Sequence, residues 1–139
     1  MVPTGIDREK LLLQFSRLRE NLRRLKEVSK DLEKSRLAVE RLLQLCIEDC
    51  INIGNHLVSG LSLRIAGTYS EIFQILEKEG VISKKVGKQM KEFVRIRNKL
   101  VHVYWKVEEK EIKNCIKKSD YFSKFVKEVH KYLKGKGML

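Results

Sequence analysis

Residues 31–58 constrain the fold more than any other stretch, because their apolar side chains recur with the period of an α-helix. The main stripe of this helix consists of Val39, Leu43, Cys46, Cys50, Ile53 and Leu57, and it is widened by Leu42, Ile47 and Ile51. A helix that is apolar over so much of its circumference must be covered on several sides. We therefore predict a central helix that begins near Asp31 or Ser35 and ends near Val58. Gly54 on the stripe would let another helix approach closely.

The same periodicity predicts four further helices, over residues 7–28, 69–79, 84–102 and 108–133. Asp7 and Ser83 are expected to cap the first and the fourth of the five helices, and Gly80 to end the third. Residues 1–5 are expected to form a short tail. One proline, eight glycines and no long apolar–polar alternation argue against a sheet. The sequence thus predicts an all-α, up-and-down bundle of about five helices, in a single domain over residues 1–139.

Charge favours a polyanionic partner. Lysine and arginine exceed aspartate and glutamate by 30 − 18 = 12, which suits RNA, DNA, an acidic protein or an anionic membrane surface without choosing among them. No apolar run has the length of a membrane span, and the first residues lack the apolar core of a signal peptide. Three cysteines, an odd number, agree with a reducing compartment. We therefore expect a cytoplasmic protein that does not enter a membrane.

Residues 95–105 gather most of the chemically versatile side chains of the chain. A helix that runs through Arg97 and ends near His102 would set a permanent cation near an imidazole that titrates close to neutrality. Such a pair suits phosphodiester cleavage without a metal, since the 2′-hydroxyl of RNA is itself the nucleophile. Tyr104 would share a face with His102 if the segment were extended. The plainer interpretation is an ordinary helix end, with a cation, a terminating Asn98 and a structural histidine.

The run from Arg97 to Tyr104 resembles the Arg-x4-His-x-Tyr signature of the HEPN superfamily, and is most similar to the HepT-like toxins of HEPN/MNT toxin–antitoxin pairs. Further segments that resemble this family are residues 37–48, 52–57, 69–73 and 80–82. The resemblance implies a helical bundle and an endoribonuclease, the toxin of a type II toxin–antitoxin module. It also implies a homodimer in which the two motifs line one cleft.

The resemblance assigns a role to each residue of the motif. Arg97 would stabilise charge on phosphorus and His102 would transfer protons, while Asn98 would orient His102, touch the substrate or simply end the helix. Tyr104 would be the residue to which an MNT nucleotidyltransferase antitoxin attaches AMP, placing negative charge beside Arg97. The alternative for Tyr104 and Trp105 is a core or interface position. Trp105 would stack on a base if it were exposed, but we expect it to be buried.

Other candidates carry weaker signals. RNA contacts are predicted for Lys99, Lys106, Glu48 and Asn55, with Lys84, Lys85 and Lys88 as further cations near the motif. For Glu48 and Asn55, which lie on the helix over residues 31–58, the alternative is a plain solvated face. The cysteines are expected in the core and His56 and His130 in structural roles, so neither a cofactor nor a metal is predicted.

A second function remains open from the sequence. The same basic helical domain would serve as a non-catalytic module that binds a nucleotide or partners a nucleotidyltransferase. A DNA-binding regulator lacks support, because no helix-turn-helix signature is present.

Overall fold

The computed structural model describes residues 5–139, and within that range every regular element is helical. The α-helices are α1 (Arg8–Val28), α2 (Leu32–Gly60), α3 (Tyr69–Lys78), α4 (Lys84–His102), α5 (Glu109–Lys117) and α6 (Asp120–Gly135), and two short 3-10 turns are η1 (Ser29–Asp31) and η2 (Tyr104–Lys106). The predicted all-α bundle is confirmed. Residues 1–4 of the predicted tail lie outside the described residues.

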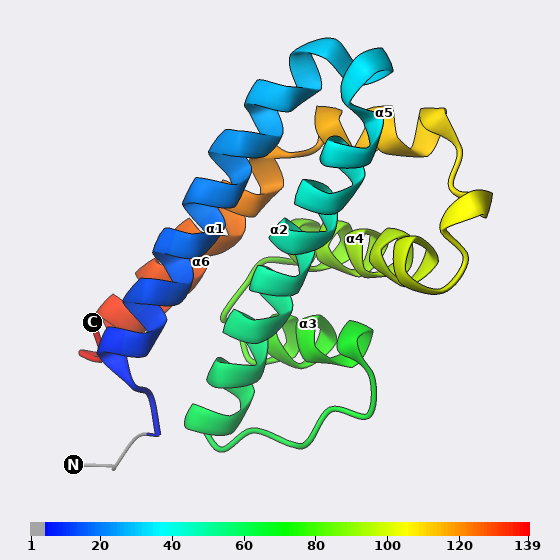
Figure 1. The fold of residues 1–139 in the computed structure, drawn as a ribbon. Coiled ribbons are helices and arrows are strands. Elements are labelled where there is room, and N and C mark those ends of the chain that lie inside the picture. The colour runs from blue at the N-terminus through cyan, green and yellow to red at the C-terminus, as the bar shows by residue number, and fades with distance from the viewer. Residues whose placement is uncertain (1–4) are drawn as a thin grey trace.

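Helices α1 and α2 form an antiparallel hairpin that η1 closes (Figure 1). Asp7 caps α1 as predicted, since its side chain accepts a hydrogen bond from the backbone N–H of Lys10. The apolar seam of α1 faces α2, and its five members are buried: Leu11, Phe15, Leu18, Leu22 and Leu25. Helix α2 is central, because α1, α3 and α4 all pack against it. Its regular part begins after Ser35, whose φ of −116° and ψ of 20° interrupt the helix.

Helices α3 and α4 form a second hairpin on the other side of α2 (Figure 1). Gly80 follows α3 with a φ of 77°, a left-handed conformation that glycine adopts without strain. Ser83 caps α4 as predicted, accepting from the N–H of Val86. Helix α3 crosses α2 at Gly54, where an added Cβ would lie 2.5 Å from a methyl of Ile72. The close approach predicted for Gly54 is therefore confirmed.

The prediction of one long final helix over residues 108–133 was wrong, because the segment forms two helices, α5 and α6. The chain breaks at Lys118 and Ser119. The N–H of Lys118 bonds to carbonyls both four and three residues back, and those of Ser119, Tyr121 and Phe122 bond three residues back. Helix α5 lies across the end of the bundle, while α6 runs back along α1 (Figure 1). Ser119 is buried among the apolar positions on either side, so the apolar spacing continues through the break and conceals it.

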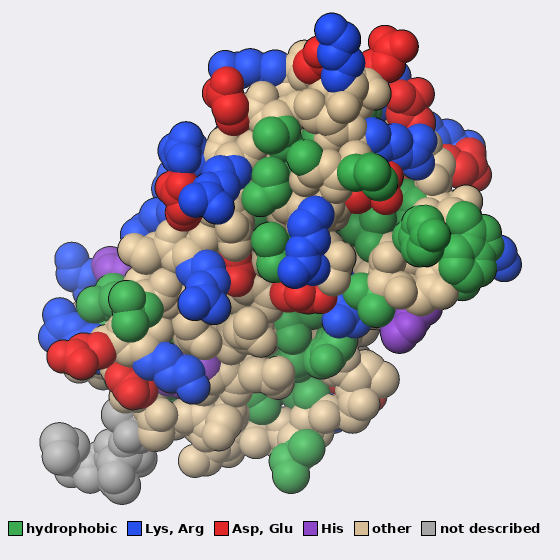
Figure 2. All heavy atoms as spheres, in the orientation of Figure 1, with side chains coloured by type: hydrophobic (Ala, Val, Ile, Leu, Met, Phe, Trp, Pro, Cys, Tyr) green, Lys and Arg blue, Asp and Glu red, His purple; other side chains and the backbone are tan. Residues whose placement is uncertain are grey.

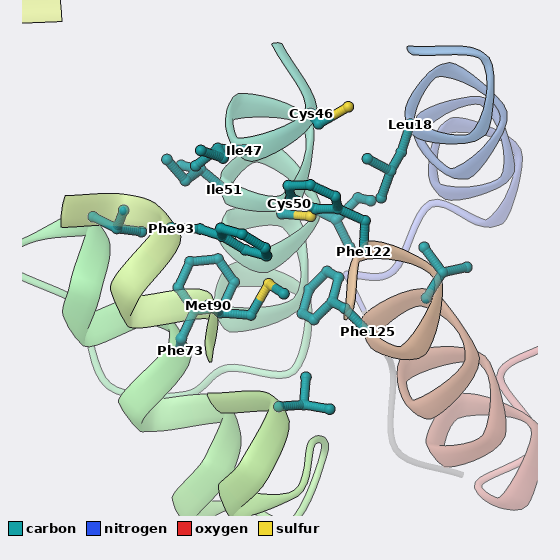
Figure 3. Packing of buried hydrophobic residues seen from close by; sticks show 14 of the residues in the cluster. Leu18, Cys46, Ile47, Cys50, Ile51, Phe73, Met90, Phe93, Phe122 and Phe125 are labelled. Atoms are coloured by element: carbon teal, nitrogen blue, oxygen red, sulfur yellow. The ribbon is translucent and has the colours of Figure 1, made fainter. Parts of the chain in front are cut away.

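The core lies where α1, α2, α3, α4 and α6 converge (Figure 3). Phe93 stacks on Phe122 with ring centroids 4.4 Å apart, and Phe73 meets Phe125 edge-on at 5.7 Å. Cys46, Cys50 and Cys115 are buried free thiols, as expected for core positions. Burial raises the pKa of Cys46 to about 12, so this thiol stays protonated. No helix described between residues 5 and 139 is long and apolar enough to cross a bilayer.

Candidate functional site

Arg97 is the centre of a polar cluster between α4 and α2. Its side chain is only 15% exposed, and its Nε donates to Oε2 of Glu48 at 3.1 Å. The same carboxylate oxygen accepts a hydrogen bond of 3.0 Å from Nε2 of Gln44, one turn earlier on α2. A half-buried guanidinium needs such partners, because burying an unpaired charge is costly. Glu48 and Gln44 therefore fix the direction of Arg97.

Tyr69 and Asn98 complete the surroundings of Arg97. The guanidinium carbon lies 5.1 Å from the centroid of the Tyr69 ring, a cation–π contact with the first residue of α3. A terminal nitrogen of Arg97 donates to Oδ1 of Asn98 at 3.2 Å. Residues of three helices thus hold one cation. Glu48 contacts only the Nε of the Arg97 guanidinium. The sequence did not single out Tyr69 or Gln44; the only signal was the four-residue spacing of Gln44 and Glu48 on one helix face.

His102 is the last residue of α4, as the sequence predicted. Its imidazole is exposed and makes no hydrogen bond to any residue in the described part of the chain. The helix ends at Val103, whose φ of −145° and ψ of 48° leave the α conformation. The chain then enters η2 at Tyr104. The extended geometry considered for the segment after His102 is therefore wrong, because η2 bends the chain at once.

Tyr104 and Trp105 stand out from the surface next to His102. They are 60% and 67% exposed, and their rings meet edge-on with centroids 5.4 Å apart. Figure 2 shows hydrophobic side chains gathered at the surface over η2. The expected burial of Trp105 was wrong, and Val101 on the last turn of α4 is also exposed, at 39%. The buried positions on this last part of α4 are Ile96 and Leu100 instead.

The predicted lysines divide into two groups. Lys99 is turned toward α5, where its ammonium lies 2.9 Å from one oxygen of Glu111 and 3.0 Å from the other. The pKa of Glu111 is lowered by the backbone N–H of Glu108 and by Lys99. The structure therefore does not bring Lys99 to Arg97, because the ammonium of Lys99 forms an ion pair with Glu111 on α5. Lys106 is exposed in η2, close in sequence to His102. The other three candidates, Lys84, Lys85 and Lys88, are exposed at the start of α4.

A pocket of about 340 Å³ opens beside Arg97. Its lining comes from α2, from the loop before α3, from the start of α3 and from α4, and includes Asn55, Gly67, Tyr69, Ile72 and Asn98. The structure thus brings two candidates, Asn55 and Asn98, to one pocket. Glu48 holds Arg97 instead of facing solvent freely.

The remaining histidines lie apart from this cluster. His56 accepts a hydrogen bond from the N–H of Asp7 at 3.0 Å and pairs with Gln14 at 2.9 Å. It holds the start of α1 against α2, a structural role as predicted, whereas His130 is exposed on α6. Among residues 5–139, no three His, Cys, Asp or Glu side chains are grouped to hold a metal ion.

Comparison with known proteins adds the family. A model described as "Ribonuclease HepT-like" matches residues 11–129. Over 102 residues the chain is 31% identical to a Bacillus subtilis protein named "Putative RNase YutE", covering 73% of this chain and 71% of that protein. It is 29% identical over 101 residues to a tRNA nuclease HepT of Aphanizomenon flos-aquae, covering 72% of this chain and 69% of the relative.

Solved structures agree on the fold. The structure of YutE from Bacillus subtilis, described as a cytosolic protein of unknown function, superposes with a TM-score of 0.85 at 25% identity, covering 98% of this chain and 96% of that one. A tri-AMPylated Shewanella oneidensis HEPN toxin in complex with its MNT antitoxin superposes with a TM-score of 0.81 at 21% identity, covering 86% of this chain and 96% of the toxin. The resemblance noted over residues 97–104, and the endoribonuclease class that it implies, are confirmed by the match over residues 11–129: the chain belongs to the HepT-like family of ribonucleases.

Proposed function

We propose that this protein is the toxin of a type II toxin–antitoxin module, and that it cleaves RNA without a metal ion through Arg97 and His102. The observation that carries the proposal is the fixed, half-buried Arg97, held by Glu48 and Tyr69, on the helix whose last residue is the exposed His102. A permanent cation and a titratable group on one short stretch are the two functions that this reaction requires. The unit that acts is one domain over residues 1–139.

The chemistry follows from these two groups. A base removes the proton of a ribose 2′-hydroxyl, and its oxygen attacks the adjacent phosphorus. The bond from phosphorus to the 5′-oxygen of the next nucleotide breaks, and that oxygen takes up a proton. The products are a 2′,3′-cyclic phosphate and a free 5′-hydroxyl. His102 serves the proton transfers, and Arg97 stabilises the charge that builds on the phosphoryl oxygens.

A second copy of the chain would complete the site. Each protomer offers one exposed imidazole at the motif, that of His102, whereas the reaction needs both a base and an acid. Val101 and Trp105 are exposed apolar side chains next to His102 that provide a surface for self-association. We therefore infer a homodimer whose two Arg97–His102 stretches line one cleft, with Lys106 and Asn55 as RNA contacts at its sides.

An MNT-type nucleotidyltransferase would neutralise the toxin by attaching AMP to Tyr104. The Tyr104 side chain is 60% exposed and follows His102 by two residues, so a transferase has access to its hydroxyl. The added phosphate would bring negative charge to the site where the RNA phosphate must bind. This proposal is supported by the solved toxin–antitoxin complexes, whose HEPN toxins share the fold of this chain.

The test compares the wild type with His102→Ala, Arg97→Ala and the control His130→Ala, which removes an exposed histidine on α6. A transfer-RNA transcript is incubated with each protein in EDTA, and the product ends are identified by mass spectrometry. We expect wild type and His130→Ala to leave 2′,3′-cyclic phosphates, and the two site variants to cut at least about 100-fold more slowly. Intact RNA with the wild type, or equal cutting by His102→Ala, would refute the enzymatic proposal.

The second candidate function is a non-catalytic module that binds a nucleotide or acts as a nucleotidyltransferase acceptor, and the exposure of Tyr104 is what favours it. Co-expression with an MNT-type partner discriminates further. AMP found on Tyr104 of a wild-type protein that leaves RNA intact in its unmodified form would favour this module over the ribonuclease.

A further inference from the structure

The pocket beside Arg97 has no role in the cleavage chemistry proposed above. Its volume of about 340 Å³ is at the lower end of the roughly 300–1,000 Å³ typical of small-ligand sites. Asn98 connects it to the motif, because this residue lines the pocket, accepts from Arg97 and precedes His102 by one helical turn. Four residues of helix rise about 6 Å, a span that a single nucleotide covers between its phosphate and its base.

The pocket presents hydrogen-bonding groups above an apolar wall. The side chain of Asn55 makes no hydrogen bond to any of the residues that the structure describes, although its amide offers both donors and an acceptor. Oδ1 of Asn98 accepts a hydrogen bond from Arg97, so the amide nitrogen of Asn98 remains available as a donor. Ile72 and the ring of Tyr69 form the apolar part of the wall. Paired amides beside an aromatic ring are the groups with which proteins read and stack a base.

The charges around the pocket favour a neutral group inside it. The residues that line it carry no formal charge. Behind the start of α3, the carboxylate of Glu71 accepts from the N–H of Gly67 at 2.9 Å and from Arg64 at 3.3 Å. These two partners, Gly67 first, lower the pKa of Glu71, so its negative charge persists there. Arg64 balances that charge, so the nearby group that attracts a phosphate is Arg97, next to the pocket and not within its lining.

We propose that this pocket holds the base of the RNA nucleotide next to the cleaved phosphate, with Asn55 and Asn98 reading the edge of the base and Tyr69 stacking on it. The inference rests on the proposed ribonuclease function and adds a specificity site to it. The phosphate of the same nucleotide then lies toward Arg97 and His102. Tyr69 has two contacts to make, one with the base and one with the Arg97 guanidinium.

The test is a cleavage assay on RNA randomised at the nucleotides around the cut, with the product ends sequenced. The variants are Asn55→Ala in the pocket and the matched control Asn114→Ala, another exposed helical asparagine, on α5. We expect the wild type and Asn114→Ala to share a base preference at one position beside the cut. Asn55→Ala should weaken that preference about tenfold and leave the preferences at other positions unchanged.

A binding measurement separates this inference from the proposed function. His102→Ala protein is titrated with 2′-deoxy dinucleotides, which lack the nucleophile, while NMR follows the side-chain amides of Asn55 and Asn98. We expect one of the four bases to shift both amides more than the others do, even if no RNA is ever cut. An unchanged preference in Asn55→Ala, together with unshifted amides, would overturn the base pocket while the ribonuclease proposal stands. Shifts seen only in protein carrying AMP would assign the pocket to the attached adenosine and equally overturn it.

Discussion

At the scale of single residues, the cluster that holds Arg97 should separate binding from turnover. Glu48 accepts from Arg97 at 3.1 Å, so we expect it to act as a positioning residue that does not touch the substrate. Glu48→Gln keeps an acceptor but removes a negative charge near an anionic substrate. We expect kcat to fall about fivefold, because a charge-assisted hydrogen bond is weakened, while KM for RNA stays equal or falls. Steady-state kinetics on a short RNA measure both values.

The control for Glu48 is Glu92→Gln. Glu92 has an exposed carboxylate on α4 that pairs with Arg95 and not with Arg97. It should alter neither kcat nor KM by more than about twofold. An increase of KM in Glu48→Gln with an unchanged kcat would mean that Glu48 contacts RNA itself, as the sequence analysis first suggested.

His56 should make the stability of the fold depend on pH. Burial and, to a smaller extent, Lys10 lower its pKa below the ordinary 6.5, with Asp7 opposing them. Its Nε2 must be unprotonated to accept from the N–H of Asp7, and Nδ1–H then donates to Gln14. Since the unfolded chain takes up the proton first, the stability due to His56 is full above pH 6.5 and is lost as the pH falls below it.

Thermal unfolding followed by circular dichroism at about pH 7.5 and about pH 5 tests this dependence. The wild type and His130→Gln should lose more Tm on acidification than His56→Gln, which has no imidazole to protonate. Equal losses in all three proteins would show that the contact between His56 and Asp7 does not affect the stability.

The residue pattern could be predicted only where the partners lie near each other along the chain. Arg97 and His102 were proposed as a pair because they share one helix and a family spacing. The role of Glu48 was not found, since its pairing with Arg97 spans 49 positions and depends on how α2 and α4 cross. Lys99 was assigned to RNA because nothing local indicates that Glu111 reaches it. Trp105 was expected inside, although a single aromatic in a short turn has no periodicity that fixes its side.

At the scale of elements, the contact of α3 with α2 should be sensitive to one methyl group. A Cβ at Gly54 would meet a methyl of Ile72 at 2.5 Å, far inside van der Waals contact. Gly54→Ala should therefore destabilise the protein by about 1–3 kcal/mol despite the better helix propensity of alanine. Gly135→Ala is the control, because nothing lies within 4 Å of its Cβ. Urea unfolding measures both, and equal stability of the two variants would contradict the tight crossing.

The helices themselves were predictable because each carries its own period and cap. Asp7, Ser83 and Gly80 mark boundaries by local hydrogen bonding and by a positive φ, which need no knowledge of the rest of the fold. The break between α5 and α6 was missed for the opposite reason. Ser119 occupies a buried position in register with its apolar neighbours, so only the different packing directions of the two helices reveal the break.

At the scale of the whole molecule, the position of the motif on α4 argues for a site shared by two chains. Five positions along an α-helix turn by about 140° beyond one full turn, so Arg97 and His102 leave α4 in different directions. Arg97 is directed to α2 and α3, whereas His102 is exposed beside Val101, Tyr104 and Trp105. We infer that a partner packed on Val101 and Trp105 would bring its own His102 toward the first chain's Arg97 and leave the Tyr104 hydroxyl open to the cleft. The sequence predicted a dimer through the family resemblance and because the motif holds a single His. It did not predict the surface itself, because exposed aromatics are indistinguishable from buried ones in a single sequence.

Mixed dimers provide the last prediction. Arg97→Ala and His102→Ala are each expected to be nearly inactive, yet the pair co-expressed with two different tags should yield heterodimers that hold one intact Arg97 and one intact His102. Such heterodimers, purified through both tags, keep one cation and one imidazole in the shared cleft, with water in place of the second imidazole. They should cut RNA at least about tenfold faster than either parent but more slowly than the wild type, since the two groups complement each other across the interface. Adding Val101→Glu to both chains should abolish the gain and give monomers by light scattering, because it buries a charge in the apolar contact. Heterodimers no faster than their parents, or a monomeric wild type that cuts RNA, would show that each chain carries its complete site.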